Sequence, residues 1–132
     1  NLRLPIIHHP AYSGGFVSPG VSGVADYLQL GLLPRIFGAD MSIFVSYGGR
    51  FTFTEEQCKR ISSYIKRPMG LMKAACPAPG GGVTDARLNE LVELYGNDTM
   101  FLVGGDMFRR GPDIEANMSY FVERLTKLSE RT

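Results

Sequence analysis

The sequence has 132 residues, of which 44% are hydrophobic and 20% charged, and its formal net charge is +1. This composition fits one globular unit and excludes a disordered or collagen-like chain. The near-neutral charge, without blocks of Lys and Arg, makes nucleic acid and anionic membrane surfaces poor partners, and no apolar run reaches the about 18 residues needed to cross a bilayer. Cys58 and Cys76 lie far apart, with no CxxC motif or Cys/His cluster. We therefore expect free thiols and a cytoplasmic protein.

Four short apolar runs predict buried strands over residues 4–9, 41–46, 71–76 and 99–103. A glycine-rich loop follows each run, and a helical pattern follows each loop. The first residue is Asn1 rather than Met, and a strand-like run follows at once. The chain is therefore expected to be part of a longer protein.

The first predicted helix is interrupted by glycine and proline, and the second is regular. The first, at about residues 22–37, is expected to kink because Gly31 and Pro34 fall inside it. Thr54 is expected to cap the second helix, in a capping box with Gln57. The second helix carries one apolar face at helical spacing: Cys58, Ile61 and Ile65.

The last two helices have clear start and stop residues. Thr84 or Asp85 is expected to cap the third helix, and Gly96 is expected to end it. Pro112 and Asp113 open the last helix. One face of this last helix is expected to lie in the core: Ile114, Met118, Phe121, Val122, Leu125 and Leu128.

A strand followed by a helix, four times over, is the pattern of parallel βαβ units, whose right-handed crossovers place all strand ends at one edge. Each unit spans roughly 33 residues, and a (β/α)8 barrel of about 250 residues uses roughly 31 for each unit. The pattern therefore predicts an α/β fold that is a partial TIM barrel of about four βα units. A four-stranded doubly wound sheet fits the spacing equally well, although no GxGxxG follows the first strand and no Walker motif occurs.

Two glycine-rich loops are candidates for an anion site. PAPGGGVT (residues 77–84) leads into a helix, and VGGD (residues 103–106) follows the fourth apolar run. Glycine lets backbone N–H groups approach an anion closely, and the dipole of a following helix favours negative charge. Neighbouring turns of this kind hold phosphate at the edge of (β/α)8 barrels. Turn glycines also occur for geometry alone, and that alternative stays open.

Histidine and arginine residues stand near the expected strand ends. His8 and His9 end the first strand, where the period of two turns one side chain toward the site and the other away. The inward imidazole suits general acid/base catalysis, with a structural role as the alternative. Arg50 ends the loop YGGR, where its guanidinium can bind a carboxylate or a phosphate. Arg109 and Arg110 either add to an anion site or lie in solvent.

Taken in order, the motifs HHPAYSGGF, GADMSIFVSYGGRFTF, PAPGGG, FLVGG and RGPD resemble the large subunit of RuBisCO, and most closely the RuBisCO-like proteins of form IV. The resemblance covers nearly the whole chain. It implies that residues 1–132 are the C-terminal half of that family's TIM-barrel domain, from strand five to strand eight.

The resemblance also implies roles for individual residues, beginning with His9 as an acid/base group. It places one phosphate on the backbone N–H groups of four turn glycines: Gly81, Gly82, Gly104 and Gly105. The carboxylases bind a second phosphate through an arginine, a histidine and a serine, where this chain has Pro10, Ile43 and Gly80. Burying a second phosphate without partners is costly, so we expect a substrate with a single phosphate.

Arg50 stands where the carboxylases have the lysine that meets carbon dioxide, so carboxylation of ribulose bisphosphate is not expected. The resemblance implies enolisation instead, in which Mg²⁺ polarises a carbonyl while a base removes the adjacent proton and leaves an enediolate. The family's Mg²⁺ ligands, a carbamylated lysine and two carboxylates, lie upstream of Asn1. This part alone is therefore expected to be inactive.

Three functions follow from the resemblance. The first is Mg²⁺-dependent enolisation of a phosphorylated sugar derivative, with decarboxylation of a compound such as oxo-isoapionate phosphate slightly preferred. The second is the diketo-methylthiopentyl-phosphate enolase reaction of methionine salvage. The third is an inactive phosphate-binding half-barrel. The complete protein is expected to be a homodimer.

Overall fold

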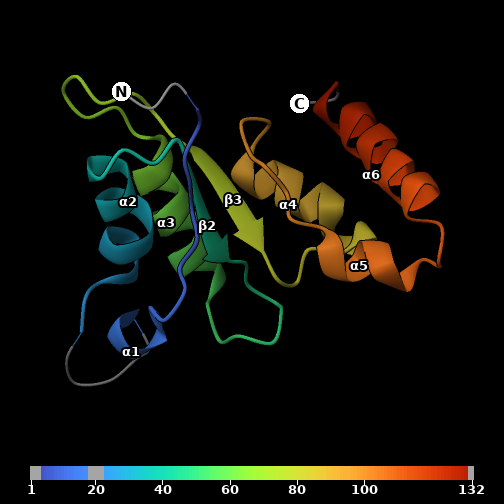
Figure 1. Ribbon diagram of the computed structural model, residues 1–132, viewed down its shortest axis with the longest axis horizontal. Helices are drawn as coiled ribbons and strands as arrows, with labels where there is room; N and C mark the ends of the chain where they lie inside the picture. The colour runs from blue at the N-terminus through green and yellow to red at the C-terminus, as the bar shows by residue number, and fades with distance from the viewer. Residues whose placement is uncertain (1–3, 18–22, 131–132) are drawn as a thin grey trace.

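The computed structural model describes residues 4–17 and 23–130 (Figure 1). Its centre is a three-stranded parallel sheet in the order β1 (Ile7–His8), β2 (Met41–Val45) and β3 (Cys76–Gly80). Leu102 continues this order through an isolated parallel bridge to Gly80. The predicted succession of parallel βα units is therefore present, with the fourth predicted strand reduced to a bridge.

The prediction of a third strand over residues 71–76 is wrong, because the strand begins at Cys76. It runs through Pro77 and Pro79, whose carbonyl oxygens accept from the backbone N–H groups of Met100 and Leu102. In a parallel ladder the N–H and C=O of one residue face the same neighbour, so the missing proline N–H groups face residues 100–102 and not β2. This also explains why the fourth predicted strand forms only a bridge.

The first predicted helix is a π-helix, Tyr27–Leu32, followed by α2 (Leu33–Ile36). The predicted start at residue 22 lies outside the described residues, and a short helix, α1 (Gly14–Val17), comes before it. Pro34 cannot donate to the carbonyl of Leu30, four residues back, and that carbonyl accepts from the Ser42 hydroxyl at 2.6 Å instead. The helix therefore has a wider, π-helical turn next to the residues that predict a kink.

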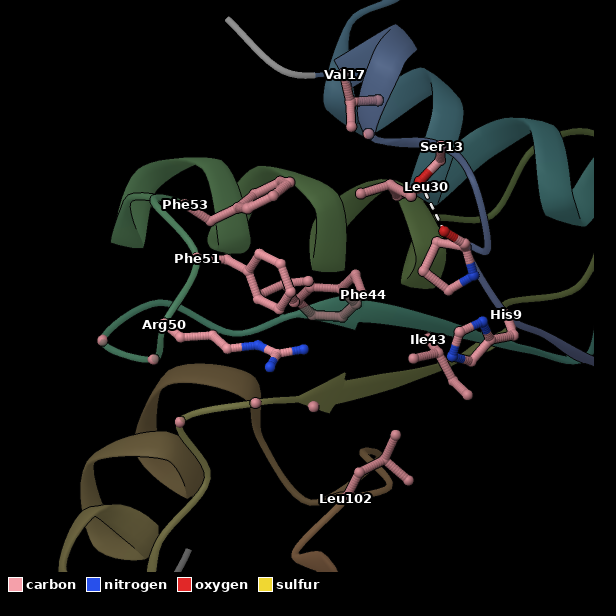
Figure 2. Close-up of a pocket in the computed structure, with 18 of the residues that line it drawn as sticks. His9, Ser13, Val17, Leu30, Ile43, Phe44, Arg50, Phe51, Phe53 and Leu102 are labelled. Atoms are coloured by element: carbon pink, nitrogen blue, oxygen red, sulfur yellow. Dashed lines mark hydrogen bonds between the residues drawn. The ribbon is translucent and has the colours of Figure 1, made fainter. Parts of the chain in front are cut away.

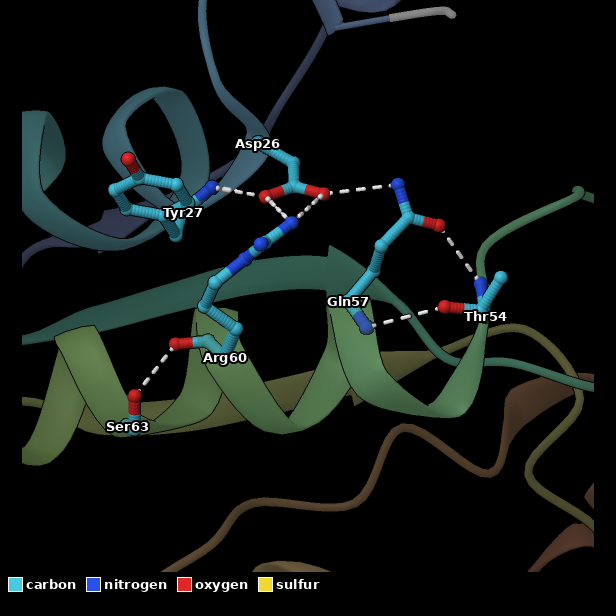
Figure 3. A network of polar contacts seen from close by, with 6 residues as sticks. All are labelled: Asp26, Tyr27, Thr54, Gln57, Arg60 and Ser63. Atoms are coloured by element: carbon cyan, nitrogen blue, oxygen red, sulfur yellow. Dashed lines mark hydrogen bonds and ion pairs between the residues drawn. The ribbon is translucent and has the colours of Figure 1, made fainter.

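The next helix, α3 (Glu55–Lys66), has the predicted capping box between Thr54 and Gln57. Figure 3 shows how Asp26 joins this helix to the π-helix. The buried carboxylate of Asp26 accepts from the backbone N–H of Tyr27 at 2.6 Å, from Nε2 of Gln57 at 2.9 Å and from the guanidinium of Arg60 at 3.2 Å. Three donors from two helices compensate for the burial of its charge.

The remaining helices lie beyond β3 (Figure 1). The third predicted helix has a 3₁₀ turn, Asp85–Arg87, and then α4 (Leu88–Tyr95), which ends at Gly96 as predicted. Thr84 occupies the capping position, but its side chain makes no capping hydrogen bond. These elements are followed by α5 (Gly104–Arg109), which was not predicted, and by α6 (Ile114–Ser129).

The start of α6 is as predicted, since the Asp113 side chain accepts from the backbone N–H of Ala116 at 2.9 Å. Its apolar face is only partly in the core, because Phe121 and Leu128 are buried while Ile114, Met118 and Val122 are exposed. The prediction that the whole face packs into the core is therefore wrong, and α6 packs mainly against α4 and α5.

The core lies between the sheet and its helices. The largest fully buried apolar side chains come from the π-helix, β2, α3, α4 and α6: Leu30, Phe44, Ile61, Ile65, Leu88, Leu91 and Phe121. Within residues 4–17 and 23–130, none of the helices is long and apolar enough to cross a membrane.

Candidate active site at the carboxyl ends of the strands

A cavity of about 880 Å³ lies at the carboxyl ends of the three strands. Its wall takes residues from the loops after β1, β2 and β3, and the π-helix and the segment around Leu102 add to it (Figure 2). The polar side chains of the wall come from five positions: His9, Ser13, Arg50, Thr84 and Arg109. Parallel strands bring these loops together although they lie far apart in the sequence.

His9 lines the cavity, and its side chain is exposed at the end of β1. His8 faces the other side, where its Nδ1 lies 3.1 Å from the Ser42 hydroxyl. That hydroxyl uses its one proton on the carbonyl of Leu30, so Nδ1 of His8 must carry the proton of this hydrogen bond. The predicted division of the pair is therefore observed in the geometry: His9 lines the cavity, and His8 is linked through Ser42 to the π-helix.

The environment of His8 predicts a pH dependence of stability. Burial, together with the nearby His9, lowers the pKa of His8. The unfolded chain, with an ordinary His pKa of about 6.5, therefore takes up the proton first as the pH falls, and the stability from the neutral ring is lost below about pH 6.5. We expect the free energy of unfolding, measured in urea, to fall less steeply from about pH 7 to about pH 5 in His8→Gln than in the wild type. Equal slopes would contradict this role of His8.

Arg50 follows two glycines in the loop after β2. Its guanidinium carbon lies 4.8 Å from the centre of the Phe51 ring, and its side chain points into the cavity (Figure 2). Stacking of this kind restrains an arginine while leaving its N–H donors available. Arg50 can therefore bind an anionic oxygen of a ligand in the cavity.

The glycines after β3 have two distinct tasks. Gly81 has a φ of +71° and lines the cavity, where the nearest atom to an added Cβ is 3.9 Å away. Gly82 has a φ of +73°, and an added Cβ would lie 2.7 Å from the backbone nitrogen of Gly49. Gly81 thus leaves backbone open to the cavity. Gly82 lines the cavity too, and its missing Cβ also allows the two loops to cross.

Gly104 and Gly105 are not in the wall of this cavity, which takes Leu102 and Arg109 from that part of the chain. Both glycines begin α5 and are exposed, and an added Cβ would contact nothing within 4 Å at either position. Their N–H groups are the first of a helix and have no partner within it. Their role in phosphate binding stays a prediction. Arg109 is bound by Asp106 at 3.1 Å, so it reaches the cavity as part of an ion pair.

The three residues that stand where the carboxylases bind a second phosphate lie together in the structure. Pro10, Ile43 and Gly80 all line the same cavity, on the β1 to β3 side. None of them has a charged or donating side chain. The wall also contains apolar side chains that sequence reasoning missed: Val17, Leu30, Phe44, Phe51, Phe53 and Leu102. Of these side chains, only Phe51 and Phe53 could have been anticipated from the sequence, because they alternate along the chain after Arg50.

Magnesium prefers several oxygen ligands, two or more of them carboxylates in a typical enzyme site. In residues 4–17 and 23–130, no three His, Cys, Asp or Glu side chains lie close enough together to hold a metal ion. Asp106, whose partner Arg109 lines the cavity, already accepts from Arg109 and from the backbone N–H of Asp85. These residues therefore do not fit a Mg²⁺ site by themselves.

Comparisons with known proteins show which sequences and folds this chain resembles. The chain is 35% identical over 118 residues to "Ribulose bisphosphate carboxylase-like protein 1" of Rhodopseudomonas palustris, covering 89% of this chain and 30% of that protein. It is 31% identical over 105 residues to "2,3-diketo-5-methylthiopentyl-1-phosphate enolase" of Exiguobacterium sibiricum, covering 80% of this chain and 26% of that protein. No protein-family model matches the sequence.

Among solved structures, the crystal structure of a RuBisCO-like protein from Alicyclobacillus acidocaldarius superposes with a TM-score of 0.86 at 28% identity. The match covers 98% of this chain and 32% of that one. The chain thus spans about 30% of the length of the relatives it matches. By sequence and fold, it is a RuBisCO-like member of the RuBisCO large-subunit family and represents part of that family's TIM barrel.

Proposed function

We propose that this chain provides the acid/base and phosphate-binding side of a RuBisCO-like enzyme that enolises a phosphorylated sugar derivative. The observation that carries the proposal is the meeting of His9, Arg50 and Gly81 at one cavity, from the loops after three successive strands. An imidazole, a fixed cation and open backbone are the groups that proton transfer beside a phosphate ester requires.

The proposed roles follow from the chemistry of each group. His9 moves the proton of the carbon next to the substrate carbonyl, and the backbone at Gly81 and Gly82 binds the phosphate, with Gly104 and Gly105 at the start of α5 as its other side. Arg50 binds a negatively charged oxygen of the substrate. Mg²⁺ belongs to the proposal for the complete enzyme, as does the homodimer, and its ligands would lie outside this chain.

The lining supports a substrate with one phosphate. Pro10, Ile43 and Gly80 offer neither cation nor side-chain donor to a second phosphate group. The apolar side chains of Val17, Phe51 and Phe53, elsewhere in the wall, favour an uncharged, apolar arm on the substrate. A methylthiopentyl phosphate fits this wall better than a polar sugar acid does. We therefore favour the diketo-methylthiopentyl-phosphate enolase reaction.

Decarboxylation of an oxo-sugar-acid phosphate is the second candidate, and Arg50 is the observation that favours it. A guanidinium binds a carboxylate through two parallel N–H donors, which would hold the group that leaves. The third candidate is an inactive half-barrel that binds phosphate.

The test uses a complete protein that contains this chain. We expect Mg²⁺-dependent exchange of solvent deuterium into 2,3-diketo-5-methylthiopentyl 1-phosphate, followed by proton NMR, and no exchange after chelation of the metal. Ribulose bisphosphate should exchange at least about tenfold more slowly, since its second phosphate lacks a partner. Release of carbon dioxide from an oxo-sugar-acid phosphate, without exchange into the diketone, would support decarboxylation. Absence of both reactions would contradict the enzymatic proposal.

A further inference from the structure

Arg87 connects the two loops on which the proposed site depends, although it is not in the wall of the cavity. Its NH1 donates to the carbonyl of Tyr47 at 2.6 Å and to the carbonyl of Gly82 at 3.0 Å. Tyr47 opens the loop that leads to Arg50, and Gly82 belongs to the loop after β3. A single guanidinium nitrogen thus joins both loops.

Glu90 holds the guanidinium in this position. Its Oε1 accepts from NH2 of Arg87 at 2.8 Å and also from the hydroxyl of Tyr47. The guanidinium carbon lies 4.5 Å from the centre of the Tyr47 ring. Burial and the carboxylate of Glu90 raise the pKa of Tyr47 to about 12, so its hydroxyl keeps the donated proton at neutral pH. Three side chains therefore fix one another at the base of the Arg50 loop.

The backbone around this group is closely packed, with glycines where a side chain would not fit. Gly48 has a φ of +74°, and an added Cβ there would lie 2.5 Å from NH1 of Arg87. An added Cβ on Gly49 would lie 2.9 Å from the backbone nitrogen of Gly82. The two loops therefore touch through glycine backbone, and the next residue after this contact is Arg50.

We propose that Arg87 is a positioning residue of the site: by joining the carbonyls of Tyr47 and Gly82, it fixes the side chain of Arg50 relative to the anion-binding turn at Gly81. This inference rests on the proposed function for its consequence, because the anion is the ligand assigned there. Preorganised loops bind more tightly, since less ordering is required when the ligand arrives. Without Arg87, both loops should open and the affinity for an anion should fall.

The test compares Arg87→Met with Arg67→Met in a complete protein that contains this chain. Arg67 is a matched control because its guanidinium also stacks on a tyrosine, 4.9 Å from the ring centre of Tyr64, away from the cavity. We expect Arg87→Met to raise amide hydrogen exchange in residues 47–50 and 80–83 roughly tenfold and to weaken binding of inorganic phosphate by a similar factor. Arg67→Met should change neither quantity.

Two further variants separate positioning from general stability. Arg87→Lys keeps the charge and should recover part of the phosphate affinity, while the thermal midpoint is followed in parallel. If Arg87→Met does not fold, Glu90→Gln takes its place, and the same loops should exchange faster. Wild-type exchange rates in both loops of the folded variant would overturn the proposal. If the wild type itself fails to bind phosphate, the proposed anion site is wrong, and the exchange rates alone decide whether Arg87 joins the loops.

Discussion

Gly82→Ala is expected to lower the free energy of unfolding by about 3 kcal/mol, as measured by urea denaturation. One part of this loss comes from the backbone, because alanine is strained at the observed φ of +73°. The other part comes from the new Cβ, which would lie 2.7 Å from the backbone nitrogen of Gly49 and 3.1 Å from the carbonyl oxygen of Tyr47. Backbone atoms on both sides cannot move as a flexible side chain could, so the crossing of the loops must open.

Gly105→Ala is the matched control for this substitution. Gly105 lies inside α5, where an added Cβ would contact nothing within 4 Å. Alanine favours a helix over glycine by about 1 kcal/mol, so this variant should be as stable as the wild type or slightly more stable. Equal unfolding midpoints for Gly82→Ala and the wild type would show that the loops do not cross as described.

His9→Gln is expected to lower the rate of substrate deuterium exchange in the complete protein by about 10²- to 10⁴-fold, the usual contribution of a general acid/base group. Glutamine keeps a polar side chain of similar length at the end of β1 but cannot accept and release a proton near neutral pH. Phosphate affinity should stay close to that of the wild type, because the phosphate is assigned to the backbone of other loops.

His8→Gln provides the control, since His8 lies next to His9 in sequence but turns away from the cavity toward Ser42. Its exchange rate should stay within about threefold of the wild type, with any change appearing in stability. Undiminished exchange in His9→Gln would remove His9 from catalysis. A parallel loss in both variants would indicate a structural effect on β1.

Local chemistry made several parts of this fold predictable. The capping box at Thr54, the cap at Asp113 and the end of α4 at Gly96 each depend on residues within one helical turn. The third strand was predicted five residues too early, because Pro77 and Pro79 indicate a loop unless their neighbour is known. The neighbour that the missing proline N–H groups face is decided by the assembled sheet. The sequence around the prolines does not indicate it.

The residues of the candidate site were likewise predictable only in part. His9 and Arg50 could be found because strand ends and glycine loops have recognisable patterns, and the structure places both at the cavity. Leu30 could not be predicted as a wall residue, since the π-helix places it at the cavity. Arg87 could not be found either, because an arginine near the start of a helix has the same local pattern whether it joins two loops or lies in solvent.

The two prolines of β3 have a consequence for association between molecules. Along its outer border this strand accepts hydrogen bonds at Pro77 and Pro79 but has no N–H to donate in return. An extended peptide from another molecule would find only half of the usual backbone pairing there. Such a border disfavours the intermolecular sheet growth that begins aggregation, so β3 is protected even when the segment at residues 100–102 comes away from it.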